Sequence, residues 1–416
     1  MIALDSETKA LLLENSLHRE IIIRFPDATE DEISEIGSSN IIAESLELTH
    51  SICDDKEFVM GGCVAGQLTV QVINIEQALN NRRINVFIRQ NYVKGNLYPS
   101  DDLYPSDDLY PGLQKDTLEI QIFSGTIDSS LRQKNRAVKE IIAYDDIYKM
   151  SQLKCYTWFV GYAQYSGTKT LRQLLYAALD KFDIWMGNDD TETSVDFTGF
   201  NDSVALTMTA DLAESVAKDS MVILDIIKAY AELNASFAVI DRFGKLKFVT
   251  LFSCPTSAST DKKDVDEAID SYADLTFEEY TTQPINRIRF KYNKSQNFDY
   301  GSSATKQSWY ISDNLITSCC TDISDLVKNF FQKNDYGTLN YIFYDLYTYR
   351  PFTADVFARW WIDPGDKVQI KTGYNDTEVV ESFVFERTIK GINGMRVTLK
   401  TKGTEFLGKD EIESDL

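Results

Sequence analysis

The chain has 416 residues and a formal net charge of −22, with 64 acidic against 42 basic side chains. This balance argues against a protein that coats nucleic acid, because phosphate contacts require Lys and Arg. It suits a soluble particle component, a surface that repels DNA passing along it, or simply solubility. A hydrophobic content of 43% and an aromatic content of 12% exclude a disordered chain, and the length predicts two or three domains.

The first predicted elements are a short helix over residues 8–16 and a strand over residues 20–25. Residues 41–75 are predicted to form a strand, a polar connection and a second strand, with adjacent glycines at 61 and 62 marking a bend. The N-terminus is too acidic, and its apolar run too short, for a signal peptide, and no later run is long enough to span a membrane. We therefore expect the protein to be assembled inside a cell.

A low-complexity insert occupies residues 96–112, where the unit Leu-Tyr-Pro-Ser-Asp-Asp occurs twice and is followed by a truncated third copy. Each Pro disfavours helix at the preceding Tyr, and each Ser-Asp-Asp favours a turn, which predicts a projecting loop. One alternative is a weak calcium site at its aspartates; a loop with no ligand is favoured over it, because no Asp-x-Asp-x-Asp-Gly pattern occurs. A partner contact is also favoured over a metal. The candidate contact residues are Tyr98, Tyr104, Tyr110, Asp101, Asp102, Asp107 and Asp108.

The middle of the chain mixes helices and strands. Strands are predicted over residues 117–126 and from residue 138, the latter running into a helical turn by residue 148. Apolar residues at helical spacing predict helices over residues 169–182 and 220–234, with Ser220 as a candidate N-cap. A hairpin over residues 237–249 follows, with Gly244 at its left-handed turn position.

The last third begins after a polar boundary at residues 253–270. It is predicted to contain a strand over residues 280–292, a helix over residues 323–331 and an aromatic-rich stretch over residues 339–350 that belongs to the core. A Pro-Gly turn at residues 363–366 then leads into a strand over residues 367–371.

A terminal hairpin is predicted over residues 383–400, where apolar and polar residues alternate. A two-residue Asn-Gly loop would mix apolar and polar residues on each face. A three-residue loop at residues 392–394, with Gly394 left-handed, places Ile389 opposite Val397 and Phe385 opposite Thr401. This second register collects the large apolar residues on one face, so it is preferred.

No catalytic, metal-binding or cofactor-binding residue is predicted. The histidines are His18 and His50, and no HExxH, GxSxG, P-loop or Rossmann pattern occurs. Acidic pairs such as Asp145-Asp146 and Asp189-Asp190 are expected as solvated faces in so acidic a chain, which disfavours a glycosidase.

The cysteines also indicate no special chemistry. With neither a CxxC nor a Cys/His cluster, we expect reduced thiols in a bacterial cytoplasm rather than a zinc site or a disulfide framework. A redox pair of Cys53 and Cys63 is considered, but small buried thiols are favoured. The cysteines are Cys53, Cys63, Cys155, Cys254, Cys319 and Cys320.

Four blocks of the chain together resemble one known family. They are S-x-E-L-T-x-S-I-C with F-x-x-G-x-C-x-A-x-x-L-T-V at residues 45–70, I-x-A-Y-D-D-I-Y-K-M at 141–150, F-x-V-I-D-R-x-G-K-L-x-F-V at 237–249, and the Pro-Gly turn, strand and terminal hairpin at 363–400. In this order they resemble the tail-tip, or baseplate, hub proteins of phages and prophages of Gram-positive bacteria. Members of this family often carry a cell-wall hydrolase after the hub region, and this sequence ends directly after the last block.

The resemblance implies an α+β, mainly β fold with two small antiparallel, tail-tube-like β-barrels and an intervening helix-and-hairpin module. The expected domains are residues 1–150 with the projecting loop, a middle α+β module at 151–255, and a C-terminal barrel at 271–416, with interleaving of the barrels allowed.

The implied function is a non-enzymatic structural hub at the distal tail tip of the virion. Three copies would form a ring that joins the tail tube to a spike or tip and lines the DNA or tape-measure channel. The implied partners are further copies of the chain, a distal tail or tail-tube protein, a spike protein and the tape-measure protein, with no cofactor. A tail-associated cell-wall hydrolase and a receptor-binding tail protein remain as alternatives.

Overall fold

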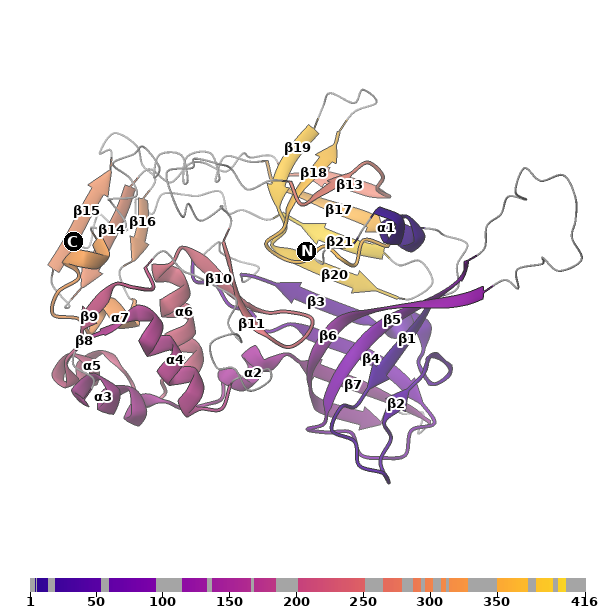
Figure 1. Cartoon of the computed structure of the whole chain (residues 1–416), viewed down its shortest axis with the longest axis horizontal. Helices are drawn as coiled ribbons and strands as arrows, with labels where there is room; N and C mark the ends of the chain where they lie inside the picture. Colours follow the sequence, from indigo (N-terminus) through magenta and orange to yellow (C-terminus); the bar gives the residue numbers. More distant parts are fainter. Residues whose placement is uncertain are drawn as a thin grey trace, which may run out of the picture.

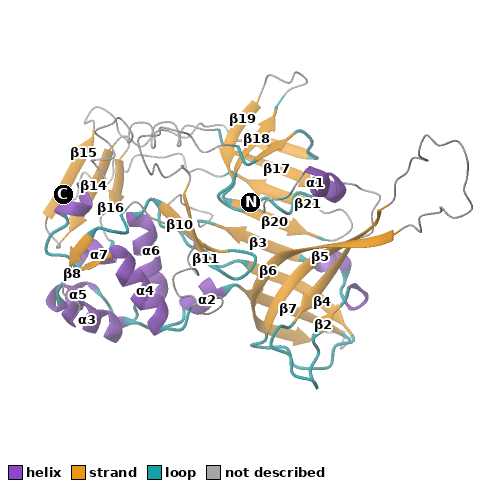
Figure 2. Ribbon diagram, in the orientation of Figure 1, coloured by secondary structure: helices purple, strands orange, loops and turns teal. Residues whose placement is uncertain are grey.

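A computed structural model describes most of the chain, which is mainly β, with helices α2–α7 gathered in one part and α1 beside the C-terminal strands (Figure 2). This agrees with the predicted fold class. The described residues are 4, 6–13, 19–53, 60–94, 114–132, 137–165, 168–184, 201–250, 265–278, 287–292, 296–301, 308–311, 314–327, 350–372, 379–391 and 396–401.

The largest element is an antiparallel sheet of eleven described strands, in the order β13-β17-β21-β20-β3-β4-β7-β6-β5-β1-β2 (Figure 1). The C-terminal strands join the N-terminal strands where β20 pairs with β3, so both ends of the sequence share one sheet. The domain boundaries remain a prediction. The strands are β1 (Arg19–Arg24), β2 (Glu35–Ile36), β3 (Glu47–Ser51), β4 (Gln67–Ile73), β5 (Arg83–Lys94), β6 (Gln114–Arg132), β7 (Val138–Tyr144), β13 (Asp274–Phe277), β17 (Phe352–Phe357), β20 (Glu386–Lys390) and β21 (Arg396–Lys400).

One face of this sheet forms the first hydrophobic core. In β4, for example, buried and half-buried residues alternate, as expected for a strand with one covered face. The core also takes in the adjacent tryptophans Trp360 and Trp361 and Leu12 of the N-terminal helix α1 (Ser6–Leu13). We call it the sheet core.

Helices and a hairpin form a module with a core of its own, the module core. Helix α4 begins with a capping box, in which Thr170 and Gln173 each satisfy the other's backbone N–H. The elements are α2 (Asp146–Met150), α3 (Tyr156–Tyr165), α4 (Leu171–Lys181), α5 (Ala210–Val216), α6 (Ile223–Leu233), α7 (Leu315–Ser318), β8 (Thr168–Thr170), β9 (Ala205–Thr207), β10 (Ser236–Ile240) and β11 (Leu246–Thr250).

The predicted N-cap of the second helix is wrong. Helix α6 is capped at Val222, whose backbone N–H donates to Asp225 at 2.9 Å, and Ser220 lies outside the helix. The predicted hairpin is confirmed as β10 and β11, with Gly244 at a φ of +85°.

Two small sheets complete the described structure: β12 (Glu267–Ile269), β18 (Lys367–Lys371) and β19 (Val379–Phe383) in one, and β14 (Arg287–Tyr292), β15 (Gln296–Gly301) and β16 (Ser308–Ile311) in the other. Single-turn 3-10 helices lie at Ser38–Asn40 and Ala43–Ser45. Among the helices whose residues are described, none is long and apolar enough to cross a membrane.

The register predicted for the terminal hairpin is confirmed, because Ile389 of β20 lies opposite Val397 of β21. The hairpin differs from the prediction at its start. The alternating stretch from Phe383 divides into β19 and β20, which belong to different sheets. The predicted loop at residues 392–394 lies outside the described residues.

Strands β5 and β6 form a long hairpin that extends beyond the rest of the sheet (Figure 1). Their pairing continues to Lys94 and Gln114, whereas the pairing of β1 with β5 reaches Gln90 within the described residues. The repeat-containing insert connects these two strand ends. Its residues 95–113 lie outside the described part of the chain.

Candidate functional site: the polar seam

The residues predicted as a partner-contact loop cannot be placed, since Tyr98, Tyr104, Tyr110, Asp101, Asp102, Asp107 and Asp108 all fall outside the described residues. The described structure instead brings together a set of buried polar groups, of which only His50 and Asp145 were noted in the sequence, neither with a predicted role. They lie where the sheet meets the helical module.

Three chain segments run from the sheet core into the module core, and each places a polar residue at the crossing. The three crossings are Leu48, His50 and Ile52; Ile389, Arg387 and Phe385; and Ala143, Asp145 and Ile147. Arg387 lies opposite His50 in the sheet, and Gly66, directly before β4, lies between His50 and Asp145. We call Arg387, His50, Gly66 and Asp145 the polar seam.

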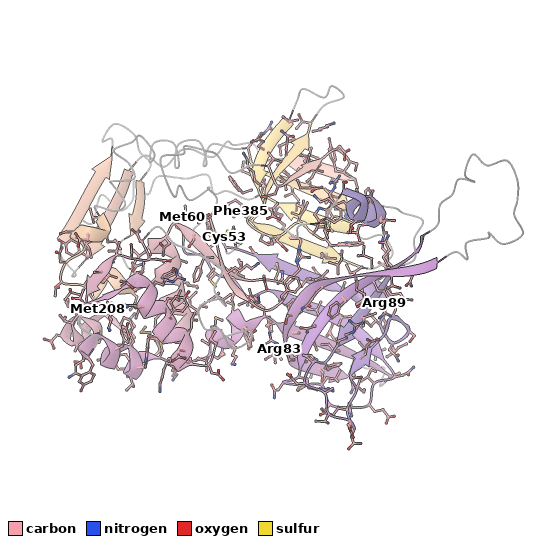
Figure 3. All side chains as sticks on the ribbon, viewed as in Figure 1. Cys53, Met60, Arg83, Arg89, Met208 and Phe385 are labelled. Carbon is pink, nitrogen blue, oxygen red and sulfur yellow. The ribbon has the colours of Figure 1, made fainter. Side chains whose placement is uncertain are left out.

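The seam is bounded on the module side by aromatic packing. The ring of Phe385 meets that of Phe237 edge to face, with 6.2 Å between centroids. In Figure 3 Phe385, Cys53 and Met60 gather where the sheet meets the module. Cys53 and Cys63 are buried in the module core, as predicted, and burial raises the pKa of the Cys63 thiol.

Arg387 is the most buried charged group of the seam, with no exposed surface. Its Nη1 donates to the carbonyl oxygens of Trp360 at 3.0 Å and Ile362 at 2.8 Å, and to Asp363 Oδ1 at 2.9 Å. Its Nη2 lies 3.1 Å from His50 Nδ1. A guanidinium without exposure needs such a set of acceptors, because an unpaired buried charge is strongly unfavourable.

Asp363 balances two guanidiniums, since Arg242 from the turn between β10 and β11 also donates to it. Burial opposes ionisation of Asp363, but the positive charges of Arg242 and Arg387 outweigh it and lower its carboxyl pKa to about 2. Burial lowers the pKa of Arg387 to about 10, so this residue is still charged at neutral pH. The result is a charged triad that ties the hairpin of the module to the sheet.

His50 is neutral in this setting. Burial, and next the charge of Arg387, lower its pKa to about 3. Because Arg387 can only donate, Nδ1 of His50 accepts, and its proton sits on Nε2. Nε2 is buried and has no hydrogen-bond partner among the described atoms.

Asp145 caps helix α2 by accepting from the N–H of Ile147 at 3.0 Å, and it also accepts from the N–H of Gly66 at 2.7 Å. Burial raises its carboxyl pKa to about 8. Gly66 has no room for a side chain, because a Cβ there would lie 2.3 Å from His50 Nε2 and 2.9 Å from Asp145 Oδ2.

The neighbouring Asp146 is also engaged in structure. Its Oδ2 lies 3.0 Å from Nη1 of Arg83, and Nη2 of the same arginine donates to Ser124 Oγ at 3.2 Å. The Asp145-Asp146 pair is therefore buried in the joint rather than on a solvated face, which corrects the expectation from the sequence. The second acidic pair, Asp189-Asp190, lies outside the described residues.

The hairpin turn of the module docks directly on the sheet. Gln121 of β6 donates through Nε2 to the Arg242 carbonyl at 2.8 Å, and Arg242 Nη1 donates back to the Gln121 carbonyl at 3.4 Å. Glycine is required at position 244 for two reasons. Its φ is positive, and a Cβ there would come within 2.6 Å of Arg83 Nη2.

Two hollows adjoin the seam. A cleft of about 740 Å³ opens between the loop at Gly61 and Gly62 and helix α6, beside Lys228 and Glu232. A smaller cavity of about 120 Å³ is lined by His50, Asp145, Arg242, Asp363, Asp366 and Lys247, and its lining is completed by Ser51, Asp241 and apolar residues. Within the described ranges no three His, Cys, Asp or Glu side chains are placed to hold a metal ion.

The seam was missed because its residues look ordinary in the sequence. Arg387 stands between Phe385 and Ile389, on what was predicted to be an apolar face. A charged residue at an apolar position of an alternating strand is the signal that could have identified it. Its side-chain partners, Asp363 and His50, are 24 and 337 residues away in sequence, so no local pattern connects them.

Comparisons with known proteins identify the fold but no sequence family. No protein-family model and no curated protein matches the chain. The crystal structure of the tail protein from Neisseria meningitidis MC58 is similar, with a TM-score of 0.52 and 11% identity over 94% of this chain and 98% of that one. The 43 kDa tail protein of prophage MuSo2 from Shewanella oneidensis matches with a TM-score of 0.49 and 11% identity over 93% of this chain and 98% of that one.

Proposed function

We propose that this chain is a structural hub at the distal end of a phage or phage-like tail. In this proposal three copies form a ring that connects the tail tube to the central spike or tip and lines the channel for DNA or the tape-measure protein. The observation that carries the proposal is the likeness to the Neisseria tail protein over nearly the whole of both chains. A match of that extent includes the sheet and the helical module together, not a single common motif.

The geometry of the described residues supports a structural rather than an enzymatic role. The buried ionisable groups of the seam hold elements together: Arg387 and Arg242 bind Asp363, and Asp145 caps a helix. His50 is enclosed in the same network and is 8% exposed. A general acid or base must reach its substrate, so these groups are poorly placed for such a role.

The proposed partners are other copies of the chain, a distal tail or tail-tube protein, the spike protein and the tape-measure protein. The proposed location is the distal tail tip of the virion, after assembly in the host cytoplasm. The resemblance in sequence suggested phages of Gram-positive hosts, but the fold is shared with a protein from Neisseria, so the fold supports no assignment of host.

An averaged cryo-electron microscopy image of the tail tip tests the proposal. We expect three copies of this chain in a ring around the tail axis, between the tube and the tip. Six copies, or a position only in a peripheral fibre, would contradict it. Native mass spectrometry of the purified protein measures its oligomeric state in solution, independently of its position in the particle. A chain that forms its ring only in the particle will be monomeric in this measurement.

A further inference from the structure

The small cavity beside the seam is the feature that the proposed function does not explain. Its walls come from both parts of the molecule: His50 and Asp145 from the sheet side, Arg242 and Lys247 from the hairpin, and Asp363 and Asp366 from the turn before β18. A volume of about 120 Å³ is enough for a few water molecules, since each takes about 30 Å³ in the liquid.

Two buried donors of this region have no partner among the described atoms, His50 Nε2 and Arg387 Nε. His50 lines the cavity and is more than nine-tenths buried. Because Nδ1 accepts from Arg387, Nε2 carries a proton and needs an acceptor. A buried donor left unsatisfied costs about 1–3 kcal/mol in other proteins, so such groups are nearly always paired with protein or water.

We propose that this cavity is a binding site for ordered water, in which a water molecule accepts from His50 Nε2 and donates to Asp145. His50 Nε2 and Asp145 Oδ2 are no more than about 5 Å apart, because a Cβ on Gly66 would lie 2.3 Å from one and 2.9 Å from the other, and one water can bridge polar atoms at such a separation. Water meets the requirement of two to four polar partners, as Asp363, Asp366 and Arg242 line the same space. The water continues the line of hydrogen bonds from Arg387 through His50 to Asp145.

A small anion is the competing occupant, and the lining argues against it. Four aspartates line the cavity: Asp145, Asp241, Asp363 and Asp366. The positive charges of Arg242 and Arg387 are already directed at Asp363, and Lys247 is paired with Asp241 at 3.0 Å. No guanidinium of this site is left to balance an added negative charge.

Selective ¹⁵N labelling of histidine tests the site, because the chain has two histidines. His18→Gln removes one of them and assigns the other signal to His50. We expect His50 as the Nε2–H tautomer at neutral pH, with its Hε2 proton exchanging slowly and showing a nuclear Overhauser cross-peak at the water frequency. An imidazolium, the Nδ1–H tautomer, or an Hε2 proton without a water cross-peak would overturn the proposal.

A crystal soaked in bromide provides the second measurement. We expect no anomalous signal in the cavity and water density between His50 and Asp145 in a crystal grown without bromide. An anomalous peak on the His50 side of the cavity would show that the site binds an anion and not water, and would overturn the proposal. His50→Phe keeps a ring of similar size without the nitrogens and should lose that water density; its retention would show that His50 does not bind the water.

Discussion

At the residue scale, the seam depends most on Arg387. Phe385, just before β20, and Ile389 within it flank Arg387 on the same face and belong to different hydrophobic cores. Arg387 bridges them with four polar contacts, to the carbonyl oxygens of Trp360 and Ile362, to Asp363 and to His50. Its role is to join the parts of the molecule without leaving a charge unpaired.

Arg387→Met should destabilise the protein by about 3–5 kcal/mol, because it leaves buried acceptors without a donor. Arg396→Met is the matched control: Arg396 also pairs with an aspartate, Asp355, but its side chain is 58% exposed, so the loss should be below about 1 kcal/mol. Urea unfolding of both variants measures the difference. Equal losses would show that the seam contributes no more than a surface ion pair.

The pH dependence of stability follows from two seam residues whose pKa values shift in opposite directions. The pKa of His50 falls from 6.5 to about 3, so its contribution to stability is present above pH 6.5 and is lost as the pH falls towards 3. The pKa of Asp145 rises from 3.8 to about 8, so its contribution is present below pH 3.8 and is lost as the pH rises towards 8.

Below pH 6.5 the contribution of His50 to stability rises with pH while that of Asp145 falls. Above pH 6.5 only the loss from Asp145 continues, and the carboxyl pKa of Asp366 is raised in the same way. We therefore expect the melting temperature to fall between pH 6.5 and 8, and to fall less in Asp145→Asn. Asp211→Asn, at an exposed position, should keep the wild-type profile. A profile unchanged by Asp145→Asn would contradict the assignment of the slope to this carboxyl.

At the scale of elements, the terminal hairpin has one covered and one open face. Leu399 is fully buried, and Lys400 is 36% exposed and paired with Glu386. Leu399→Asp should unfold the region, because it buries a charge in the sheet core. Lys400→Asp should cost about 1 kcal/mol or less, from a lost surface pair and a new repulsion. Thermal unfolding compares them, and the reverse order would mean that the register is wrong by one residue.

The long hairpin of β5 and β6 gives a second prediction at this scale. Removing one Leu-Tyr-Pro-Ser-Asp-Asp unit shortens the connection between Lys94 and Gln114 and should change stability by less than about 0.5 kcal/mol, because closure entropy depends weakly on loop length. Differential scanning calorimetry measures the change. A large loss would show that the repeat contributes to the folded core.

At the scale of the whole molecule, the seam predicts that the two hydrophobic cores unfold together. Three chain segments pass from one core to the other, and the triad of Arg242, Asp363 and Arg387 ties the hairpin to the sheet. Local opening of one core alone would therefore separate charges of the seam from partners that stay buried in the other core, and an unpaired buried charge is unfavourable.

Two probes distinguish the cores in one urea titration. Labelling of the buried thiols Cys155 and Cys319 reports on the module core, and fluorescence of Trp360 and Trp361, with the other tryptophans replaced by Phe, reports on the sheet core. We expect coincident transitions. Separate midpoints would mean that the seam joins two independently stable units.

The sequence by itself determined the local elements of this protein. Alternation of polar and apolar residues predicted β4, β7 and the terminal hairpin with its register, and helical spacing predicted α4 and α6. These predictions succeed because a strand or helix with one buried face carries its period in consecutive residues.

The tertiary structure alone decided where those elements meet. The pairing of β20 with β3 and the contacts of Arg387 with Asp363 and His50 join residues that are far apart in the chain, and no period records them. The same residue types occur on many solvated surfaces, and only burial between two cores makes a charge depend on a particular partner. The seam therefore follows from packing, whereas its strands follow from local pattern.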